Sequence, residues 1–487
     1  MMPSDDICYR ALRTRDARFD GRLFVGITST GIYCRPICPA RTAKRQNCRF
    51  FPSAAAAQMA GFRPCLRCRP EISPDAAAWR GTSSTVSRAL ALIAEGALDG
   101  GDGSIPALAE RLGMGERQLR RLFEKHLGAA PIAVAQTRRI LFAKQLIQET
   151  LLPMVSVAAA SGFGSVRRFN DAFSKLYGRS PRELRRKASG ERSIIVLRLG
   201  YRPPYDWEAI LDFFRARSIE GVECVSKQSY RRTFSVEGAV GHIDVRMGER
   251  DALVAAIQIS DVRALLSVVG RLRRLFDLDA DVEAIGAHLS EDKGLAPLIA
   301  TRPGLRTPGT FDAFELSVRA VLGQQITIAA ARKLAGQVAK LAGRTFAAGE
   351  GLTHIFPGAA ELANADLSSL GMPRARIASL KALASAVRSD PKLLEASGTT
   401  EEVLQRLRAL PGFGPWTAQY WALRALRDAD AFPEADVGLL RSPVIADKGA
   451  RLSPKALLAR AENWRPWRGY AAQHLWTAEG DARRANG

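Results

Sequence analysis

The sequence predicts a multidomain α+β protein: a small cysteine-rich domain, an all-α domain with tandem helix-turn-helix units, a β-containing subdomain and a helical carboxyl-terminal domain. Three observations support this fold class. The chain has 487 residues, and domains of about 100–200 residues give roughly three to four of them. Six of its seven cysteines lie within the first 68 residues. Helical periodicity and strand-like segments occupy separate parts of the chain.

Composition narrows the possible classes of protein. Hydrophobic residues make up 47% and charged residues 25% of the chain, which is ordinary for a globular protein and excludes a disordered chain or a coiled coil. No run of about 18 apolar residues occurs, and the polar start PSDD is unlike a signal peptide. We therefore expect a soluble protein of the cytoplasm.

The charge distribution points to a nucleic acid as partner. The net charge is +22, and the first 190 residues carry 31 basic and 15 acidic residues. A basic domain of this size binds nucleic acid by neutralising phosphates and releasing counterions. The alternative is that the basic balance serves only solubility.

Four of the cysteines form two close pairs, Cys34 and Cys38 in GIYCRPIC and Cys65 and Cys68 in RPCLRC. Two such pairs bring four sulfurs to one tetrahedral ion, and thiolates at about 2.3 Å are ligands that zinc prefers. In a cytoplasmic chain this clustering favours a metal over disulfides. From spacing alone, a structural zinc site without chemistry is the preferred interpretation. Cys8 and Cys48 are expected to be small structural residues or incidental thiols.

The residues around the two pairs change that interpretation. TSTGIYCRPICPAR followed by FRPCLRCRPE resembles the amino-terminal domain of the bacterial Ada methylation-response family, over residues 5–80. The resemblance implies that Cys34 takes a methyl group from a DNA phosphotriester irreversibly, because zinc holds the thiol deprotonated. Methylation would remove one negative charge from the site and so raise its affinity for DNA. The cysteine spacing by itself does not single out Cys34.

Two candidate helix-turn-helix units follow. IPALAERLG with MGERQLRRLFEKHL is the first, with Gly113 at its turn, and VSVAAASGF with SVRRFNDAFSKLYG is the second, with Gly162 at its turn. In each unit the apolar residues recur at helical spacing and form one core face. Polar residues early in each second helix are placed to contact DNA bases and phosphates: Arg117, Gln118, Arg120, Arg121, Arg167, Arg168 and Asn170.

The tandem arrangement is more specific than either unit alone, because single helical hairpins with a turn glycine are common. Two units closed by GRSPRELRRK resemble the AraC-type regulator domain over residues 83–188. The resemblance implies that the units read adjacent major-groove segments of promoter DNA, and that RNA polymerase is a partner. The alternative is a plain helical linker.

From Ser193 the pattern changes to strands. IIVLRL is the first, YRPPYDW leads into a helix, and β-like segments follow at 230–240 and 243–245; from about Pro303 the chain is expected to be almost wholly helical. LPGFGPWTA has the form of a helix-hairpin-helix turn, in which Gly412 and Gly414 let backbone N–H groups approach a DNA phosphate. This turn is also a candidate site for a monovalent cation. Taken alone, it could be any tight turn.

Asp436 lies about twenty residues beyond this turn, in FPEADV. Together with GQQI, LGMP, TRPGLRTPGTFDAFE and ENWRPWRGYAAQHLW, this arrangement resembles the AlkA-type alkyladenine glycosylases over residues 196–479. The resemblance implies that Asp436 is the catalytic carboxylate beside the sugar C1′, where positive charge develops in the transition state. Glu434, at the wrong offset for this family, is interpreted as a solvated loop acid.

The same resemblance implies a pocket of aromatic side chains around the damaged base: Phe213, Trp416, Tyr420 and Trp476. Electron-rich rings suit cationic N-alkylated purines, at roughly 0.5–2 kcal/mol per good contact. Trp421 and Trp467 are expected in the core instead. Two departures bear on DNA contacts and substrate range: Gln325 stands where the family uses an aliphatic wedge, and Val437 where an aromatic residue can occur.

Three absences in the sequence limit the chemistry. Trp416 stands where related lyases have their nucleophilic lysine, so the resemblance implies a monofunctional glycosylase. Beyond Cys68 the sequence has only Cys224, which excludes a four-cysteine iron–sulfur cluster. The Pro-Cys-His-Arg motif of methylguanine methyltransferases does not occur, so direct reversal of base methylation is not predicted.

We therefore expect four domains, at 1–80 (zinc methyl acceptor), 81–190 (tandem helix-turn-helix), 191–300 (AlkA-like β-containing subdomain) and 301–487 (helix-hairpin-helix glycosylase). The predicted function is a bifunctional adaptive-response DNA repair protein, monomeric and associated with the bacterial nucleoid. One alternative is a transcription regulator whose carboxyl half is catalytically silent. Another is a zinc-stabilised DNA-binding enzyme that does not sense methylation.

Overall fold

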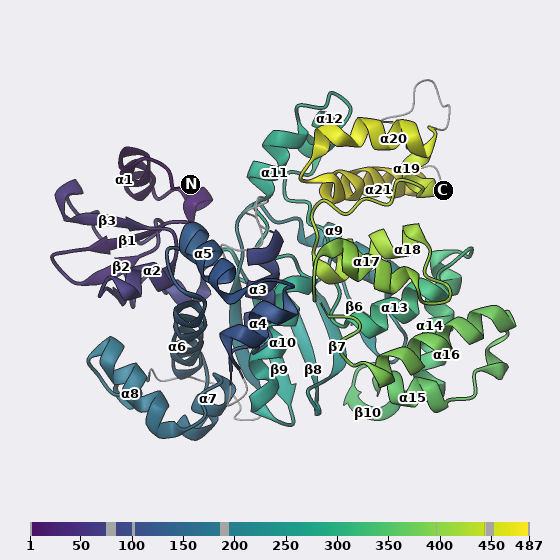
Figure 1. Cartoon of the computed structure of the whole chain (residues 1–487), viewed down its shortest axis with the longest axis horizontal. Helices are drawn as coiled ribbons and strands as arrows, with labels where there is room; N and C mark the ends of the chain where they lie inside the picture. The colour runs from purple at the N-terminus through teal and green to yellow at the C-terminus, as the bar shows by residue number, and fades with distance from the viewer. Residues whose placement is uncertain are drawn as a thin grey trace. The chain divides into compact units, whose positions relative to one another are not determined.

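The computed structural model describes residues 2–74, 84–99, 103–185, 194–395, 397–442, 444 and 452–485 (Figure 1). The chain forms two compact units, one of Met1–Pro203 with Val236–Gly270 and one of Pro204–Ser235 with Arg271–Gly487. Within the described residues no helix combines the length and apolar character needed to cross a bilayer. The domain limits expected near residues 80 and 190 lie outside the described residues.

The first unit opens with a four-stranded sheet of order β3-β1-β2-β4. Its elements are α1 (Asp5–Thr14), η1 (Ala17–Phe19), β1 (Phe24–Ile27), β2 (Ile32–Cys34), η2 (Arg45–Asn47), β3 (Cys48–Phe51), α2 (Ala54–Met59), β4 (Arg63–Pro64) and η3 (Pro70–Ile72). β2 and β4 run parallel, with Tyr33 opposite Pro64. Parallel strands end at the same edge of a sheet, so the next residues, Cys34 and Cys65, lie side by side.

Cys8 and Cys48 belong to the core of this sheet domain, as predicted. Both are buried, and they share a hydrophobic cluster with Leu12, Leu23 and Val25. Burial raises the pKa of the Cys8 thiol to about 11. A thiol in such surroundings stays protonated and unreactive at neutral pH.

The helical region confirms the two helix-turn-helix units. Its elements are α3 (Ser84–Ala94), α4 (Ile105–Arg111), α5 (Glu116–Leu127), α6 (Pro131–Glu149), α7 (Met154–Ala160), α8 (Val166–Tyr177) and η4 (Arg182–Leu184). The turn glycines Gly113 and Gly162 have φ of 67° and 76°, a left-handed conformation that residues with a Cβ rarely adopt. Phe123 on α5 and Phe169 on α8 face the core and are fully buried.

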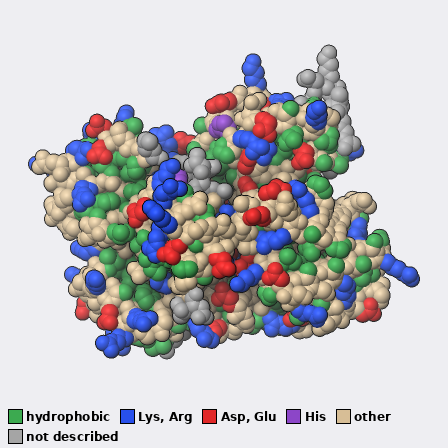
Figure 2. Space-filling view, in the orientation of Figure 1, with side chains coloured by type: hydrophobic (Ala, Val, Ile, Leu, Met, Phe, Trp, Pro, Cys, Tyr) green, Lys and Arg blue, Asp and Glu red, His purple; other side chains and the backbone are tan. Residues whose placement is uncertain are grey.

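The seven residues predicted to contact DNA from this region are all exposed: Arg117, Gln118, Arg120 and Arg121 on α5, and Arg167, Arg168 and Asn170 on α8. Figure 2 shows Lys and Arg side chains gathered over α5. Arg120 donates to Glu116 one turn earlier at 2.6 Å, and exposed pairs of this kind contribute about 0–1 kcal/mol. The guanidinium of Arg120 can therefore exchange this partner for a phosphate at little cost.

Helix α6 joins the sheet domain to the helical domain through buried polar contacts. The Lys144 ammonium and the Glu71 carboxylate are 2.7 Å apart and both side chains are 0% exposed. Lys144 also donates to the carbonyl of Cys65 at 3.3 Å. One turn further, Glu149 accepts from Arg69 at 2.6 Å and from the backbone N–H of Arg198 at 3.1 Å. Three separate chain segments therefore meet on one face of α6.

The remaining elements of the first unit are β5 (Ile195–Gly200), β8 (Ala239–Met247), β9 (Ala252–Ile259) and η5 (Val262–Ala264), followed by α10 (Leu265–Leu275), which runs into the second unit. β9 pairs antiparallel with both β5 and β8, with Ala255 opposite Leu197 and Val245. The strand predicted at 194–199 corresponds to β5, and the segment predicted at 243–245 lies within β8. β9 was not predicted from the sequence.

The second unit is mainly helical. Its elements are α9 (Trp207–Arg217), β6 (Glu223–Val225), β7 (Ser229–Val236), α11 (Val282–Leu289), α12 (Ala296–Thr301), α13 (Ala313–Leu322), α14 (Ile328–Ala342), β10 (Arg344–Gly349), β11 (Leu352–Ile355), α15 (Ala359–Asn364), η6 (Ser368–Leu370), α16 (Arg374–Ser389), α17 (Thr400–Arg408), α18 (Pro415–Trp421), η7 (Ala422–Leu426), α19 (Val437–Leu440), α20 (Pro454–Ala461), η9 (Glu462–Trp464) and α21 (Arg468–Ala485). The expectation of an almost wholly helical chain after Pro303 is wrong at one place. β10 and β11 form an antiparallel hairpin, turned at Gly349 and Gly351, which have φ of 76° and 85°.

A buried network of four charged residues fixes β6 and β7 to α13. Arg232 donates to Glu315 at 2.6 Å, and Arg319 donates to both Glu223 and Glu315, at 2.5 and 2.6 Å. The Glu315 carboxylate is enclosed, and although desolvation opposes its ionisation, Arg232 and Arg319 lower its pKa to about 2. The network therefore holds the amino-terminal end of α13, whose other end leads to Gln325.

We predict that the Lys144 and Glu71 pair anchors the sheet domain to α6. Lys144→Met leaves the Glu71 carboxylate buried beside Arg69 alone, and removing one partner of a buried pair costs about 3–5 kcal/mol. The urea-unfolding transition of the first unit should move to lower denaturant accordingly. Lys125→Met, on the exposed face of α5, is the control and should change the free energy of unfolding by less than about 0.5 kcal/mol. Equal effects of the two variants would contradict the anchoring role.

Candidate functional site

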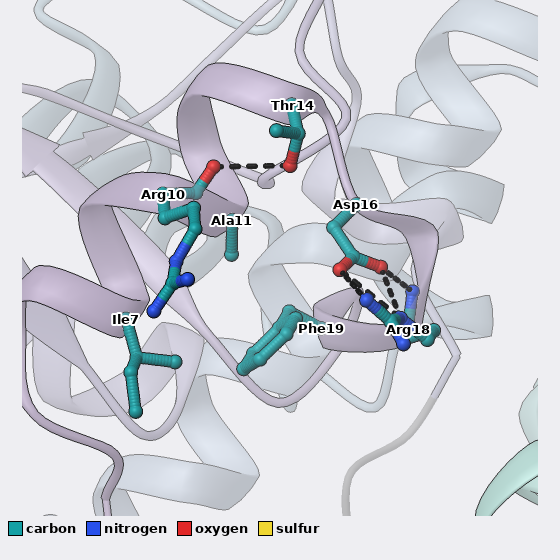
Figure 3. A pocket seen from close by; sticks show the side chains of 7 residues that line it. All are labelled: Ile7, Arg10, Ala11, Thr14, Asp16, Arg18 and Phe19. Carbon is teal, nitrogen blue, oxygen red and sulfur yellow. Dashed lines mark hydrogen bonds and ion pairs between the residues drawn. The ribbon is translucent and has the colours of Figure 1, made fainter.

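A cavity of about 570 Å³ lies against α1 and η1, lined by Ile7, Arg10, Ala11, Thr14, Asp16, Arg18 and Phe19 (Figure 3). Two of the charged side chains that line the cavity are paired with each other: Arg18 donates to both carboxylate oxygens of Asp16. None of the predicted site residues lines it. The cavity is therefore separate from the two candidate sites described below.

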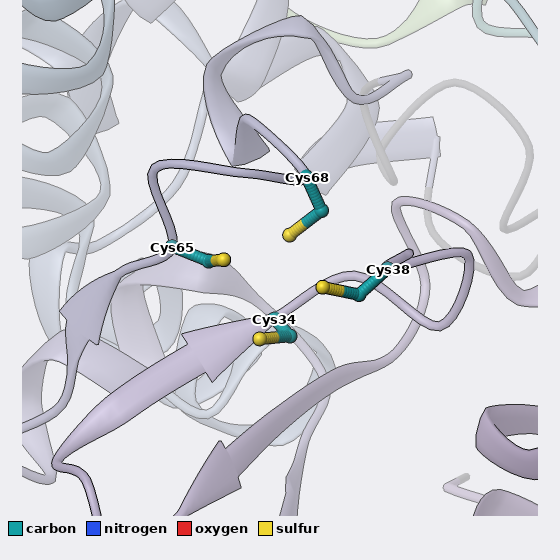
Figure 4. A group of neighbouring side chains, drawn as sticks. All are labelled: Cys34, Cys38, Cys65 and Cys68. Carbon is teal, nitrogen blue, oxygen red and sulfur yellow. The ribbon is translucent and has the colours of Figure 1, made fainter. Parts of the chain in front are cut away.

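The four predicted zinc ligands converge on one point. The sulfurs of Cys34, Cys38, Cys65 and Cys68 all lie within 4.8 Å of one another, and Figure 4 shows the four side chains directed toward a common centre. Sulfurs placed tetrahedrally at about 2.3 Å from a zinc ion are about 3.8 Å apart. The donor set and its spacing therefore fit one zinc ion.

The four sulfurs differ in the hydrogen bonds that they accept. The backbone N–H of Arg35 donates to Cys68 at 3.3 Å, and that of Arg67 donates to Cys65 at 3.4 Å. The Ala40 N–H donates to Cys38. Over the described ranges, no backbone N–H donates to the sulfur of Cys34. Since such bonds withdraw electron density from sulfur, Cys34 is the most nucleophilic of the four by this criterion.

The thiols also compete with one another for protons. Hydrogen bonding with Cys38 raises the pKa of Cys34, whereas hydrogen bonding with Cys34 lowers the pKa of Cys65. Four adjacent thiolates therefore need a cation at their centre. The nearby Arg35 is not free to serve, because its guanidinium is bound to the Asp20 carboxylate and to the carbonyl of Cys68.

The second site is built around Asp436, which begins α19 as its N-cap. Oδ2 accepts from the Trp416 indole N–H at 2.8 Å, and Oδ1 accepts from the Trp476 indole N–H at 2.9 Å and from the Leu439 backbone N–H at 3.0 Å. Three donors from three different helices fix the orientation of a half-buried carboxylate. None of them carries a positive charge. Glu434, the rival acid, has no such set of donors in the described part of the chain.

The predicted aromatic residues surround this carboxylate. Trp416 and Tyr420, one turn apart on α18, are stacked with ring centres 5.3 Å apart, and Tyr420 meets Trp476 edge-on at 6.4 Å. Phe213, on α9, shares a cationic neighbour with two of these rings. The guanidinium of Arg424 lies over the rings of Phe213, Tyr420 and Trp476. As predicted, Trp421 and Trp467 are core residues, 0% and 9% exposed.

The helix-hairpin-helix turn lies at the start of α18. Gly412 has φ of 85°, and a Cβ there would lie 2.9 Å from Ser379 Oγ; Gly414 is the N-cap of α18 and is exposed. The side chain of Gln324 donates to the carbonyl of Gly412 at 2.5 Å. Gln325, next to it, is exposed and has φ of 58°. The GQQI loop and the hairpin turn therefore form one continuous exposed surface.

Several residues of this site were not predicted from the sequence. Gln419 accepts from the Phe432 N–H at 3.1 Å and so orders the loop before Asp436. A Cβ on Gly438 would lie 3.1 Å from Asp436 Oδ1 and 2.6 Å from Glu479 Oε2, so a larger residue there would require these side chains to shift. Arg424 was missed although a signal existed: it interrupts the apolar run WALRAL, one helical turn after Tyr420.

Three family models match successive parts of the chain. They describe the metal-binding domain of Ada (residues 7–71), a helix-turn-helix domain (108–187) and the AlkA N-terminal domain (196–312). These matches cover the cysteine cluster, both helix-turn-helix units and the β-containing part of the carboxyl half.

Individual relatives extend the likeness over the whole chain. The chain is 41% identical over 479 residues to the probable bifunctional transcriptional activator/DNA repair enzyme AlkA of Mycobacterium tuberculosis strain H37Rv, which covers 96% of this chain and 95% of the relative. It is 35% identical over 290 residues to DNA-3-methyladenine glycosylase 2 of Escherichia coli K12, covering 58% of this chain and 97% of that protein.

Among solved structures, the 3-methyladenine DNA-glycosylase from Archaeoglobus fulgidus has the same fold as the carboxyl half, with a TM-score of 0.51, 21% identity and coverage of 58% of this chain and 97% of that one. The near full-length relative and the three successive family matches agree with one another. The chain therefore belongs to the family of bifunctional transcriptional activator/DNA repair AlkA proteins.

Proposed function

We propose that this protein senses methylated DNA through Cys34, binds promoter DNA through its tandem helix-turn-helix units and hydrolyses the N-glycosidic bond of alkylated purines through Asp436. In this proposal the functions are carried by four domains, with the limits 1–80, 81–190, 191–300 and 301–487. The observation that carries the proposal is the Asp436 carboxylate, held by the indole N–H groups of Trp416 and Trp476 beside the hairpin turn.

In the sensing step, the Cys34 sulfur attacks the methyl carbon of a phosphotriester. The S–CH₃ bond forms, the O–CH₃ bond breaks, and the phosphate leaves as the phosphodiester anion, so charge is balanced without a further reactant. Zinc, when bound to the four cysteines, keeps their sulfurs deprotonated. The Cys34 sulfur accepts no backbone hydrogen bond in the described residues, which favours it over its three neighbours.

In the excision step, the damaged nucleotide is turned out of the helix so that its base meets the aromatic rings. The fixed carboxylate of Asp436 stabilises positive charge at C1′ and orients the attacking water. Tyr420 and the indoles of Trp416 and Trp476 offer ring surfaces to the base. No lysine stands at the hairpin turn position of Trp416, so the proposal is a monofunctional glycosylase without lyase activity.

Further partners belong to the same proposal. Exposed Gly412 and Gly414 would hold a DNA phosphate, with a monovalent cation at the hairpin turn, and Gln325 would take the place of the displaced base. Promoter-bound protein would contact RNA polymerase. We propose a cytoplasmic, nucleoid-associated monomer.

A catalytically silent carboxyl half is the rival function. It would need DNA binding by the hairpin turn but no oriented acid. In a module that only binds a phosphate backbone, a carboxylate would be a disadvantage, because it repels phosphates. Such a module would have no need to hold the Asp436 carboxylate in place with three N–H donors. The geometry therefore favours the active enzyme.

Asp436→Asn should abolish release of 3-methyladenine from methylated duplex DNA, with a loss of at least about 100-fold in single-turnover rate, because an amide carries no charge to stabilise C1′. Glu434→Gln, two residues away, is the matched control and should retain excision. Released base is measured by chromatography. Absence of release by the wild type would establish the silent-module function instead, and equal measurable release by wild type and Asp436→Asn would show that Asp436 is not the catalytic acid.

Incubation with DNA that carries methylphosphotriesters should add one methyl group to Cys34, seen by peptide mass spectrometry. Cys34→Ser should gain none, because a serine hydroxyl is not ionised by this site. Cys224→Ser, at a cysteine outside the cluster, should gain one methyl as the wild type does. A methyl group found on Cys38, or on no cysteine, would contradict the assignment of Cys34.

Removal of metal gives a separate test of the sensing site. A zinc chelator should release one ion per chain and prevent methyl transfer to Cys34, since the thiol then regains its proton. Excision of 3-methyladenine should continue, because no cysteine contributes to the Asp436 site. Loss of both activities together would show that the metal supports the whole fold rather than the sensing chemistry.

A further inference from the structure

Gln325 lies in the short loop between α13 and α14, in a backbone conformation that its side chain disfavours. It is exposed and has φ of 58°. The chain after the loop is fixed by Thr327, the N-cap of α14, whose hydroxyl accepts from the Ala330 N–H at 3.2 Å. A residue with a Cβ adopts a left-handed conformation at a cost in free energy, and it keeps this conformation only where surrounding contacts hold the backbone.

One such contact holds the peptide group that precedes Gln325. Arg376, half-buried on α16, donates to the carbonyl of Gln324 at 2.6 Å. This carbonyl belongs to the planar peptide unit that links Gln324 to Gln325. Because α14 fixes the chain after the loop, a change of φ at Gln325 to the ordinary negative range would have to turn this unit. The turn would break the hydrogen bond with Arg376, so this bond favours the left-handed conformation.

The side chain of Gln324 connects the same loop to the hairpin turn. Its amide donates to the carbonyl of Gly412 at 2.5 Å and to the hydroxyl of buried Thr417 at 3.3 Å. Helix α16, which carries Arg376, also contacts the turn, since a Cβ on Gly412 would lie 2.9 Å from Ser379 Oγ. The loop and the turn are therefore bound to each other and to one supporting helix.

These contacts fix the spacing between two groups that the proposed function uses together. The hairpin turn is proposed to hold a DNA phosphate, and Gln325 to take the place of the displaced base. A loop that became ordered only on binding DNA would add its ordering entropy to the free energy of turning out the base. A loop that is already ordered avoids this addition.

We propose that Arg376 and Gln324 are positioning residues for base extrusion. Arg376 holds the left-handed conformation of Gln325, and the Gln324 side chain fixes the distance between Gln325 and the hairpin turn. This rests on the proposed glycosylase function. Neither side chain takes part in breaking the bond at C1′. Their loss should therefore slow excision where a paired base must be turned out of the helix, and matter little where the base is already unpaired.

The test compares single-turnover excision of one N-methylated purine from two duplexes by saturating full-length protein. The purine is paired in one duplex and unpaired, in a one-nucleotide bulge, in the other. Arg376→Met and Gln324→Ala should each slow excision about tenfold in the paired duplex and no more than about twofold in the bulged one. Arg376→Lys keeps a charged donor and should restore part of the rate. Gln324→Ala leaves Arg376 in place, so it remains informative if Arg376→Met does not fold.

A double-mutant cycle tests whether Arg376 acts through Gln325. In Gln325→Gly no side chain remains to be positioned, and glycine adopts a positive φ freely. Adding Arg376→Met to Gln325→Gly should therefore change the rate in the paired duplex by less than about twofold. Fully additive effects of the two substitutions would mean that Arg376 acts on the DNA directly, and would overturn the inference.

Arg374→Met is the matched control. Arg374 is exposed, carries the same charge and lies two residues earlier on α16. Its loss weakens only the general attraction for phosphates, so the ratio of the two excision rates should stay that of the wild type. Equal slowing of both duplexes by Arg376→Met and Gln324→Ala, or an unchanged rate in the paired duplex, would overturn the inference. Wild-type protein that excises the purine from neither duplex would refute the proposed function itself.

Discussion

The need to compensate buried charge organises this protein more than any other constraint. An ion removed from water without a partner destabilises a fold by several kcal/mol, so each enclosed carboxylate commits distant segments to one another. Glu71, in η3, requires Lys144 on α6, and this pair holds the cysteine-bearing loops against the helical domain. Glu315 on α13 likewise requires Arg232 on β7. In both cases one short contact determines where a whole element lies.

The Asp436 pocket follows a different arrangement. Its carboxylate is bound by uncharged N–H donors, and Arg424 is bound by uncharged oxygen acceptors. Neither charge is neutralised by an ion pair, and aromatic rings lie between them. In the pairs Lys144–Glu71 and Arg232–Glu315, by contrast, the opposite charges are in direct contact. Leaving the charges of Asp436 and Arg424 without an ion pair costs stability, and departures of this kind from the packing rules are expected at functional sites.

The sequence predicted those parts of the fold and site that depend on local spacing. The cysteine pairs, the two turn glycines and the offset from the hairpin turn to Asp436 are all short-range patterns, and the structure brings the corresponding residues together. The partnership of Glu71 with Lys144 spans 73 residues, and no local pattern encodes it. The β10–β11 hairpin was missed because TFAAGEGLTHI has little strand propensity, and Arg424 because a lone arginine in an apolar helix gives no indication of its neighbours.

The distinction between Cys34 and the other three cysteines shows why backbone geometry has to supplement spacing. Cys34 is the last residue of β2, between β1 and β4, where backbone N–H groups are used in the sheet: the N–H of Cys65, for example, donates to the carbonyl of Tyr33 at 3.0 Å. Cys68 lies in a turn, and Cys38 and Cys65 lie in loops next to turns; backbone N–H groups of Arg35, Ala40 and Arg67 donate to these three sulfurs. Four chemically identical thiols thus become unequal, because only the residue in the strand keeps its sulfur electron density undiminished by backbone donors.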